Sequence, residues 1–189
     1  MRAVLTAVYL DFESRTCCRV WRWLSLLPVR DTIEVRPFAT DVGGGEARGP
    51  WDRTVASWGL ELLALGELAR ESGREVHLRY VDAVFDAVHG DRDDVSSPEM
   101  WLALGSQLGL DLDAFTADSE RWRAEVGLWH AEARDELGVT GVPSLVFDDT
   151  HALFVTLDRD IRDRAAAQRL LDDLDDLAAQ PVGEVRRTA

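Results

Sequence analysis

The feature that most constrains the fold is an apolar segment near the N-terminus that changes abruptly into a helical pattern. Residues 3–10 are almost entirely apolar, which is typical of a strand buried on both faces of a sheet. From Ser14 to Leu27 the apolar residues recur at helical spacing, and Pro28 ends the pattern. The N-terminus of such a helix favours negative charge, including a thiolate, through its backbone N–H groups and its dipole. The junction is therefore the first place to look for chemistry.

The composition disfavours several classes of partner. The 189 residues carry a net charge of −14, which argues against nucleic acid and anionic membranes. No apolar segment approaches the roughly 20 residues that cross a bilayer, and the N-terminus lacks a secretory profile. We therefore expect a cytoplasmic protein that acts on a small-molecule substrate, with no nucleic-acid or membrane partner. Its oligomeric state is left open, a homodimer included.

The order of patterns along the chain predicts the architecture. Residues 31–38 alternate apolar and polar residues as a second strand, and residues from about 51–137 are predominantly helical. Strand character returns over 138–147 and 152–157 with a turn between them, and Asp160 is expected to cap a final helix. A right-handed crossover would make the first two strands parallel, and the late hairpin adds antiparallel pairing.

This order predicts an α/β, thioredoxin-like fold with an inserted all-helical subdomain. We expect a discontinuous thioredoxin-like domain from residues 1–45 and 138–180, a helical insertion over 50–137 and a disordered tail over 181–189. The insertion holds five of the seven tryptophans, most of which are expected in the core, although some could line a pocket for a flat substrate. These five are Trp51, Trp58, Trp101, Trp122 and Trp129.

The cysteines and histidines argue against a metal site. The only cysteines are the adjacent pair Cys17 and Cys18, so there is no long-range disulfide framework. His77, His130 and His151 have no metal-ligand spacing with one another or with the cysteines. No metal cofactor is therefore expected.

Two motifs resemble one protein family. The first is D-F-x-S-x-x-C over residues 11–17, at the junction of strand and helix. The second is G-V-x-G-V-P-S over residues 138–144, where a proline at the head of a strand is typical of a cis peptide bond. With the helical insertion, these motifs resemble the DsbA-like branch of the thioredoxin superfamily. That branch includes FrnE-type oxidoreductases, hydroxychromene-carboxylate isomerases, kappa-class glutathione transferases and mycothiol-dependent reductases, and the resemblance spans residues 3–178.

The chain differs from the redox members of this family at the first position of the Cys-x-x-Cys motif, and this difference determines which activity the resemblance implies. Redox members carry Cys-x-x-Cys with the first cysteine as the nucleophile, whereas here Ser14 stands at that position and Cys17 at the second. By its resemblance to the isomerases and kappa-class transferases, Ser14 would donate a hydrogen bond to the thiolate of a bound low-molecular-weight thiol, mycothiol or glutathione. The protein would then reduce, isomerise or conjugate a small hydrophobic substrate.

The same resemblance implies which residues bind the cofactor. The backbone of Val142, beside a cis Pro143, would hold the peptide-like part of the thiol by strand-type pairing. Arg15 or Arg19 would meet a carboxylate of the thiol. His89, which ends an amphipathic helix of the insertion, is either a helix-end residue with no catalytic role or a residue that approaches the cleft.

Two alternatives stay open. The first is a monothiol disulfide or thiol-exchange oxidoreductase that reacts through Cys17 or Cys18. Cys17 lies on the apolar stripe of its helix and is expected to be a small buried residue, so Cys18, on the flank with Arg22, is the better candidate for an accessible thiol. The second is a catalytically silent relative whose cleft binds a peptide or a small ligand, because Ser-Arg-Thr-Cys replaces the usual Cys-Pro-Trp-Cys. The candidate catalytic residues are thus Ser14, Cys17 and Cys18.

Overall fold

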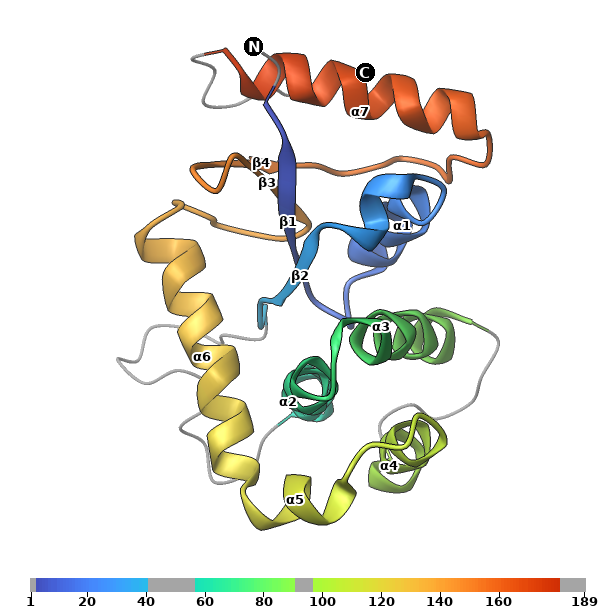
Figure 1. The fold of residues 1–189 in the computed structure, drawn as a ribbon, viewed down its shortest axis with the longest axis vertical. Coiled ribbons are helices and arrows are strands. Elements are labelled where there is room, and N and C mark those ends of the chain that lie inside the picture. Colours follow the sequence, from blue (N-terminus) through green and yellow to red (C-terminus); the bar gives the residue numbers. More distant parts are fainter. Residues whose placement is uncertain (1–2, 41–56, 91–96, 181–189) are drawn as a thin grey trace.

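The computed structural model describes residues 3–40, 57–90 and 97–180 (Figure 1). The tail predicted to be disordered, 181–189, lies outside this part. The sheet has four strands, β1 (Leu5–Leu10), β2 (Glu34–Pro37), β3 (Ser144–Phe147) and β4 (His151–Phe154). The helices are α1 (Arg15–Leu24), the 3₁₀ helix η1 (Pro28–Asp31), α2 (Trp58–Glu71), α3 (Arg74–His89), α4 (Pro98–Gln107), α5 (Leu112–Ala117), α6 (Ser119–Asp135) and α7 (Arg164–Ala178).

The strand order is β2-β1-β3-β4, with the buried β1 inside the sheet. β1 runs parallel to β2, as predicted, and β3 runs antiparallel to both β1 and β4. The hairpin between β3 and β4 turns at Asp148 and Asp149, whose φ angles of 51° and 57° are the left-handed conformation that tight hairpin turns require. The sheet therefore combines a parallel crossover with an antiparallel hairpin.

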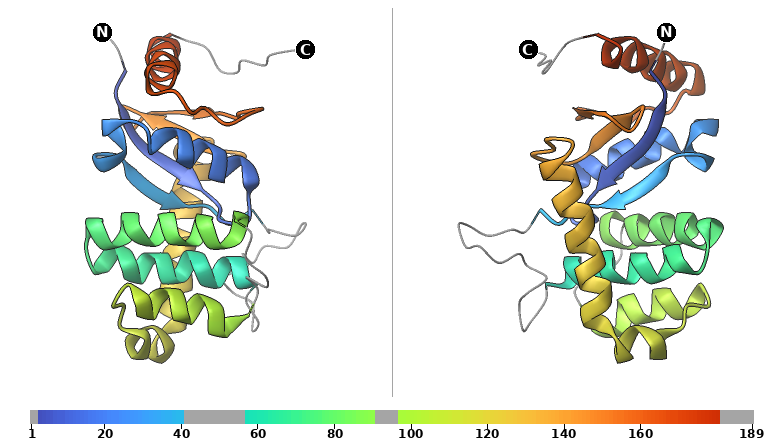
Figure 2. Two further views of the ribbon diagram at one scale, coloured as in Figure 1. Left: turned by 90° about the vertical axis from the view of Figure 1, so that its right-hand side faces the viewer. Right: turned by 60° about the vertical axis from the view of Figure 1, so that its left-hand side comes forward.

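Helix α1 lies between α7 and α3 (Figures 1 and 2). The indole N–H of Trp23 donates to the carbonyl of Ala167 in α7 at 3.1 Å, and the indole N–H of Trp21 donates to Asp82 of α3 at 2.8 Å. Both indoles are almost completely buried, so these bonds satisfy donors that would otherwise be costly to bury. They fix α1, and with it the strand–helix junction, against two neighbours.

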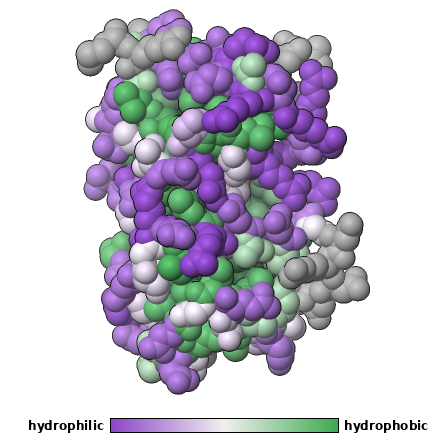
Figure 3. All heavy atoms as spheres, turned by 45° about the vertical axis from the view of Figure 1, so that its right-hand side comes forward, coloured by the Kyte–Doolittle hydropathy of each residue, from purple (hydrophilic) through white to green (hydrophobic). Residues whose placement is uncertain are grey.

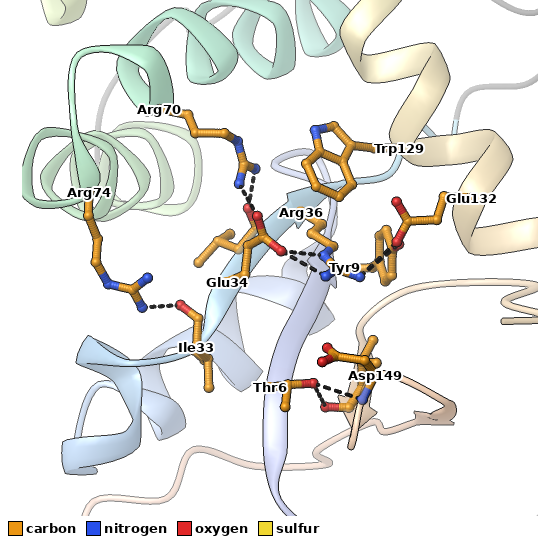
Figure 4. A network of polar contacts seen from close by, with 12 residues as sticks. Thr6, Tyr9, Ile33, Glu34, Arg36, Arg70, Arg74, Trp129, Glu132 and Asp149 are labelled. Atoms are coloured by element: carbon orange, nitrogen blue, oxygen red, sulfur yellow. Dashed lines mark hydrogen bonds and ion pairs between the residues drawn. The ribbon is translucent and has the colours of Figure 1, made fainter. Parts of the chain in front are cut away.

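Helices α2 to α6 lie between β2 and β3 in the chain and extend away from the sheet on the side opposite α7 (Figure 2). A polar cluster joins them to the sheet (Figure 4). The guanidinium carbons of Arg36 and Arg70 lie 5.1 and 4.9 Å from the ring centre of Trp129 on α6. The indole N–H of Trp129 donates to Glu67 at 3.0 Å. Glu132 accepts from Arg36 at 2.8 Å. The insertion is thereby tied to β2.

Several predicted element ends are wrong. The late strands, predicted over 138–147 and 152–157, are shorter, and α1 ends at Leu24 and not at Leu27. Asp160 does not cap the final helix: Asp163 does, accepting the N–H of Ala166 at 2.7 Å. Asp160 instead pairs with Arg19 at 3.7 Å, in a connection that runs along α1 before the helix starts. The second strand begins at Glu34 and not at residue 31, because η1 occupies the preceding residues.

On the face seen in Figure 3, hydrophilic side chains surround several apolar areas, the largest of them in the lower half of the view. In the described part of the chain, no helix is both long enough and apolar enough to span a bilayer.

Candidate active site

Ser14 is the N-cap of α1, as its position before the helical pattern predicts. Its hydroxyl oxygen accepts the N–H of Cys17 at 3.3 Å and lies 2.8 Å from the hydroxyl of Thr16. A serine hydroxyl has two lone pairs and one proton, so when Thr16 is the donor of their shared bond, Ser14 keeps its proton for a further partner. Ser14 is partly exposed, and a ligand at the end of the helix can therefore be that partner.

Asp11 organises the loop between β1 and α1. Its carboxylate is 1% exposed and accepts the N–H of Glu13 at 2.9 Å, the N–H of Thr40 at 2.8 Å and the hydroxyl of Thr40. Its own N–H donates to the sulfur of Cys17 at 3.4 Å. Asp11 opens the D-F-x-S-x-x-C motif, but its role in holding this loop was not predicted; a carboxylate directly after a buried strand is the sequence signal for it. These bonds hold the loop that carries Ser14.

Both cysteines are buried thiols. Cys17 is 0% exposed and Cys18 2% exposed. Burial raises the pKa of Cys17 to about 12, although hydrogen bonds from the Asp11 backbone and from Ser14 act in the opposite direction. Burial also raises the pKa of Cys18, against the charge of Arg22. The prediction that Cys17 is a small buried residue is confirmed, whereas Cys18, the better candidate for an accessible thiol, is buried as well.

The loop before β3 lies at the same end of the sheet as Ser14. Tyr9 is paired with Ser144, which places Pro143 opposite Leu10 at the end of β1. Asp11 is the next residue after Leu10, and its carbonyl accepts the N–H of Ser14 at 3.2 Å. The peptide bond between Val142 and Pro143 is cis. The Pro143 carbonyl accepts from Val155 at 3.0 Å, whereas the N–H and C=O of Val142 have no hydrogen-bond partner among the described residues.

The two candidate arginines differ in availability. Arg15 is exposed at the first position of α1. Arg19 donates to the carbonyls of Leu157 and Asp158 at 3.1 and 3.3 Å and pairs with Asp160. Arg19 therefore positions the connection between β4 and α7, and Arg15 is the cation that a ligand at the helix terminus can reach.

His89 reaches the active-site loop from the insertion. Its Nε2 lies 2.8 Å from the carbonyl oxygen of Phe12, and since a carbonyl only accepts, Nε2 carries the proton. Burial lowers the pKa of His89, which keeps the ring neutral at pH 7. The N-terminus of α2 also meets this loop, because a side chain at Gly59 would overlap the carboxylate of Glu13. The loop is thus braced by α2 and α3.

Apolar side chains border the site. Phe154 is 59% exposed, and its ring lies against Gly141, where an added Cβ would be 3.5 Å away. Trp101 and Trp122 are buried in the insertion, so they are core residues and line no substrate pocket. Trp58, partly exposed at the start of α2, is the tryptophan of the insertion that lies next to the loop contact at Gly59. No three histidine, cysteine or acidic side chains of the described residues are grouped as a metal site.

Two solved structures from Wolbachia pipientis share this fold. One is the thiol-disulfide exchange protein alpha-DsbA2, with a TM-score of 0.57 and 17% sequence identity over 89% of this chain and 80% of that chain. The other is alpha-DsbA1, with a TM-score of 0.59 and 15% identity over 91% and 85% of the respective chains. No family model and no curated protein matches the chain. The predicted thioredoxin-like fold of the DsbA type, with its helical insertion, is confirmed.

Proposed function

We propose that this protein binds a low-molecular-weight thiol, mycothiol or glutathione, with the sulfur at Ser14, and acts on a small hydrophobic substrate by reduction, isomerisation or conjugation. One observation carries the proposal. A partly exposed hydroxyl occupies the helix terminus, whereas both thiols of the chain are buried and have raised pKa values. A site of this kind suits a nucleophile that arrives with the ligand. We place the protein in the cytoplasm, where such thiols are kept reduced.

The helix terminus would stabilise the thiolate by three effects. Ser14 donates a hydrogen bond to the sulfur, the N-terminal N–H groups of α1 contribute partial positive charge, and Arg15 adds a full one. Each favours the charged form of the bound thiol and so lowers its pKa. The thiol itself supplies the nucleophilic sulfur when bound.

The rest of the ligand would lie along the loop before β3. The backbone groups of Val142, which have no hydrogen-bond partner in the described part of the chain, fit a peptide-like chain as one more extended strand. The exposed ring of Phe154 borders that loop and suits the apolar body of a substrate. Asp11 and His89 hold the loop by bonds to its backbone and act as positioning residues.

The test measures binding by calorimetry with glutathione, with mycothiol and with S-methylglutathione, which has no thiol proton. Ser14→Ala should weaken binding of the thiol roughly tenfold or more at neutral pH, because it removes a hydrogen bond to a charged sulfur. Ser25→Ala, at the other end of α1, is the matched control and should leave binding unchanged.

Two outcomes would overturn the proposal. If neither thiol binds, the protein is better described as a silent ligand-binding relative. If Cys17→Ser or Cys18→Ser abolishes thiol-dependent turnover while Ser14→Ala does not, a monothiol exchange through the chain's own sulfur replaces the proposal.

A further inference from the structure

A hollow opens beside the C-terminal half of α1, between this helix and the connection from β4 to α7, which Figure 1 shows side by side. Its volume is about 280 Å³, close to the lower bound of roughly 300 Å³ for small-molecule sites. The wall from α1 and the residues after it consists of Arg19, Arg22 and Leu26, and the wall from the connection consists of Asp160, Ile161 and Arg162.

The lining has an excess of positive charge. Three guanidinium groups face one carboxylate, and that carboxylate, Asp160, already pairs with Arg19 at 3.7 Å. Arg22 pairs with Asp86 at 3.6 Å, whose side chain is 78% exposed and does not line the hollow. Arg162 makes no ion pair with any residue in the described part of the chain. In a protein with a net charge of −14, a hollow lined by three arginines and one carboxylate is a specific feature.

Arg19 joins the two walls of the hollow. Arg19 is held by the carbonyls of Leu157 and Asp158 at 3.1 and 3.3 Å, which keep the connection against α1. The nearby carbonyl of Trp21 at the end of α1 accepts both the N–H and the hydroxyl of Ser25 at 2.9 Å, so its partial negative charge is engaged. A wall that is already held in place loses little freedom when a ligand binds.

Leu26 and Ile161 supply the apolar part of the lining, and both also pack against the hydrophobic core. We propose that this hollow binds a small organic anion with an apolar body, such as a carboxylate, sulfonate or phosphate monoester. Arg22 and Arg162 receive the anionic group, for which the guanidinium fork has matching geometry, and the two aliphatic side chains receive the body. The proposal does not rest on thiol chemistry, because Ser14 lies eight residues before Arg22, about 12 Å along the helix axis.

The test uses benzenesulfonate, a permanent anion, against benzenesulfonamide, a neutral molecule of nearly the same shape. Both are titrated into the ¹⁵N-labelled protein and followed by amide shifts. Benzenesulfonate should shift amides of residues 19–26 and 158–163 and bind at least tenfold more tightly than the sulfonamide. Arg162→Ala should weaken benzenesulfonate binding about fivefold or more, whereas Arg169→Ala, an exposed arginine on α7 outside the hollow, should leave it within twofold.

A third variant reverses the direction of the effect. Asp160→Asn removes the only carboxylate of the lining and should strengthen benzenesulfonate binding severalfold. Equal binding of the two probes, shifts confined to other residues, or equal effects of Arg162→Ala and Arg169→Ala would each overturn the proposal. Inorganic sulfate binding as tightly as benzenesulfonate would overturn the assigned role of the apolar side chains.

Discussion

If the nucleophile comes with the ligand, the chain's own cysteines must be nearly unreactive in the native state. The perturbation is alkylation by iodoacetamide at neutral pH, in the folded protein and in the guanidinium-unfolded chain. Burial raises the pKa of Cys17 from 9.0 to about 12. The thiolate fraction at neutral pH then falls about a thousandfold, and reagent access to a fully buried sulfur lowers the rate further.

Mass spectrometry of single-cysteine variants measures each thiol separately. Cys18→Ser reports on Cys17, and Cys17→Ser reports on Cys18. We expect the Cys17 rate in the folded protein to be at least a thousandfold below that of the unfolded chain, and the Cys18 rate to be strongly reduced as well. A folded-state rate for either thiol within about tenfold of the unfolded rate would refute this reasoning.

Two further predictions concern stability. Burial lowers the pKa of His77 from 6.5 to about 3, so the unfolded chain takes up this proton first and the free energy of unfolding falls as the pH drops from about 6.5 to about 3. At a pH of about 4.5, His77→Gln should therefore reduce the acid-induced loss of unfolding free energy by roughly 2–3 kcal/mol, measured by urea unfolding. Parallel curves of unfolding free energy against pH for the two proteins would contradict this prediction. Trp129→Phe removes the N–H bond to the buried Glu67 but keeps a ring beside Arg36 and Arg70, and it should cost about 1.5–3 kcal/mol. If Trp58→Phe, near the start of α2, lowers the free energy of unfolding as much as Trp129→Phe does, the bond from Trp129 to Glu67 does not stabilise the fold as predicted.

Local patterns predicted the elements and several of their ends. Ser14 precedes a helical pattern and accepts the N–H of Cys17, three residues later. In the structure, Ser97 and Asp111 cap α4 and α5 in the same way. Capping is a short-range interaction, so a single sequence contains the information. Residue type does not show which of Asp160 and Asp163 caps the final helix, since both are aspartates. Only the packing of the connection against α1 decides between them.

The environment of the site depended on contacts that sequence spacing does not contain. Cys18 is on the flank of its helix with Arg22, yet it is only 2% exposed in the folded chain. The interactions of Trp129 join α6, α2 and β2, which lie far apart in the sequence (Figure 4). Long-range packing of this kind sets burial and pKa values, and it changed the assignment of Cys18.

The pKa of the bound thiol tests the proposed role of Ser14 most directly. It is measured through the ultraviolet absorbance of the thiolate in a saturated complex. In the wild-type protein the pKa of bound glutathione or mycothiol should lie below that of the free thiol, and Ser14→Ala should raise it by about 1 unit or more. Cys17→Ala should leave it unchanged, since the Cys17 sulfur is buried and bonded to the Asp11 backbone. A bound thiol with the pKa of the free one, or with the same pKa in wild type and Ser14→Ala, would contradict the account.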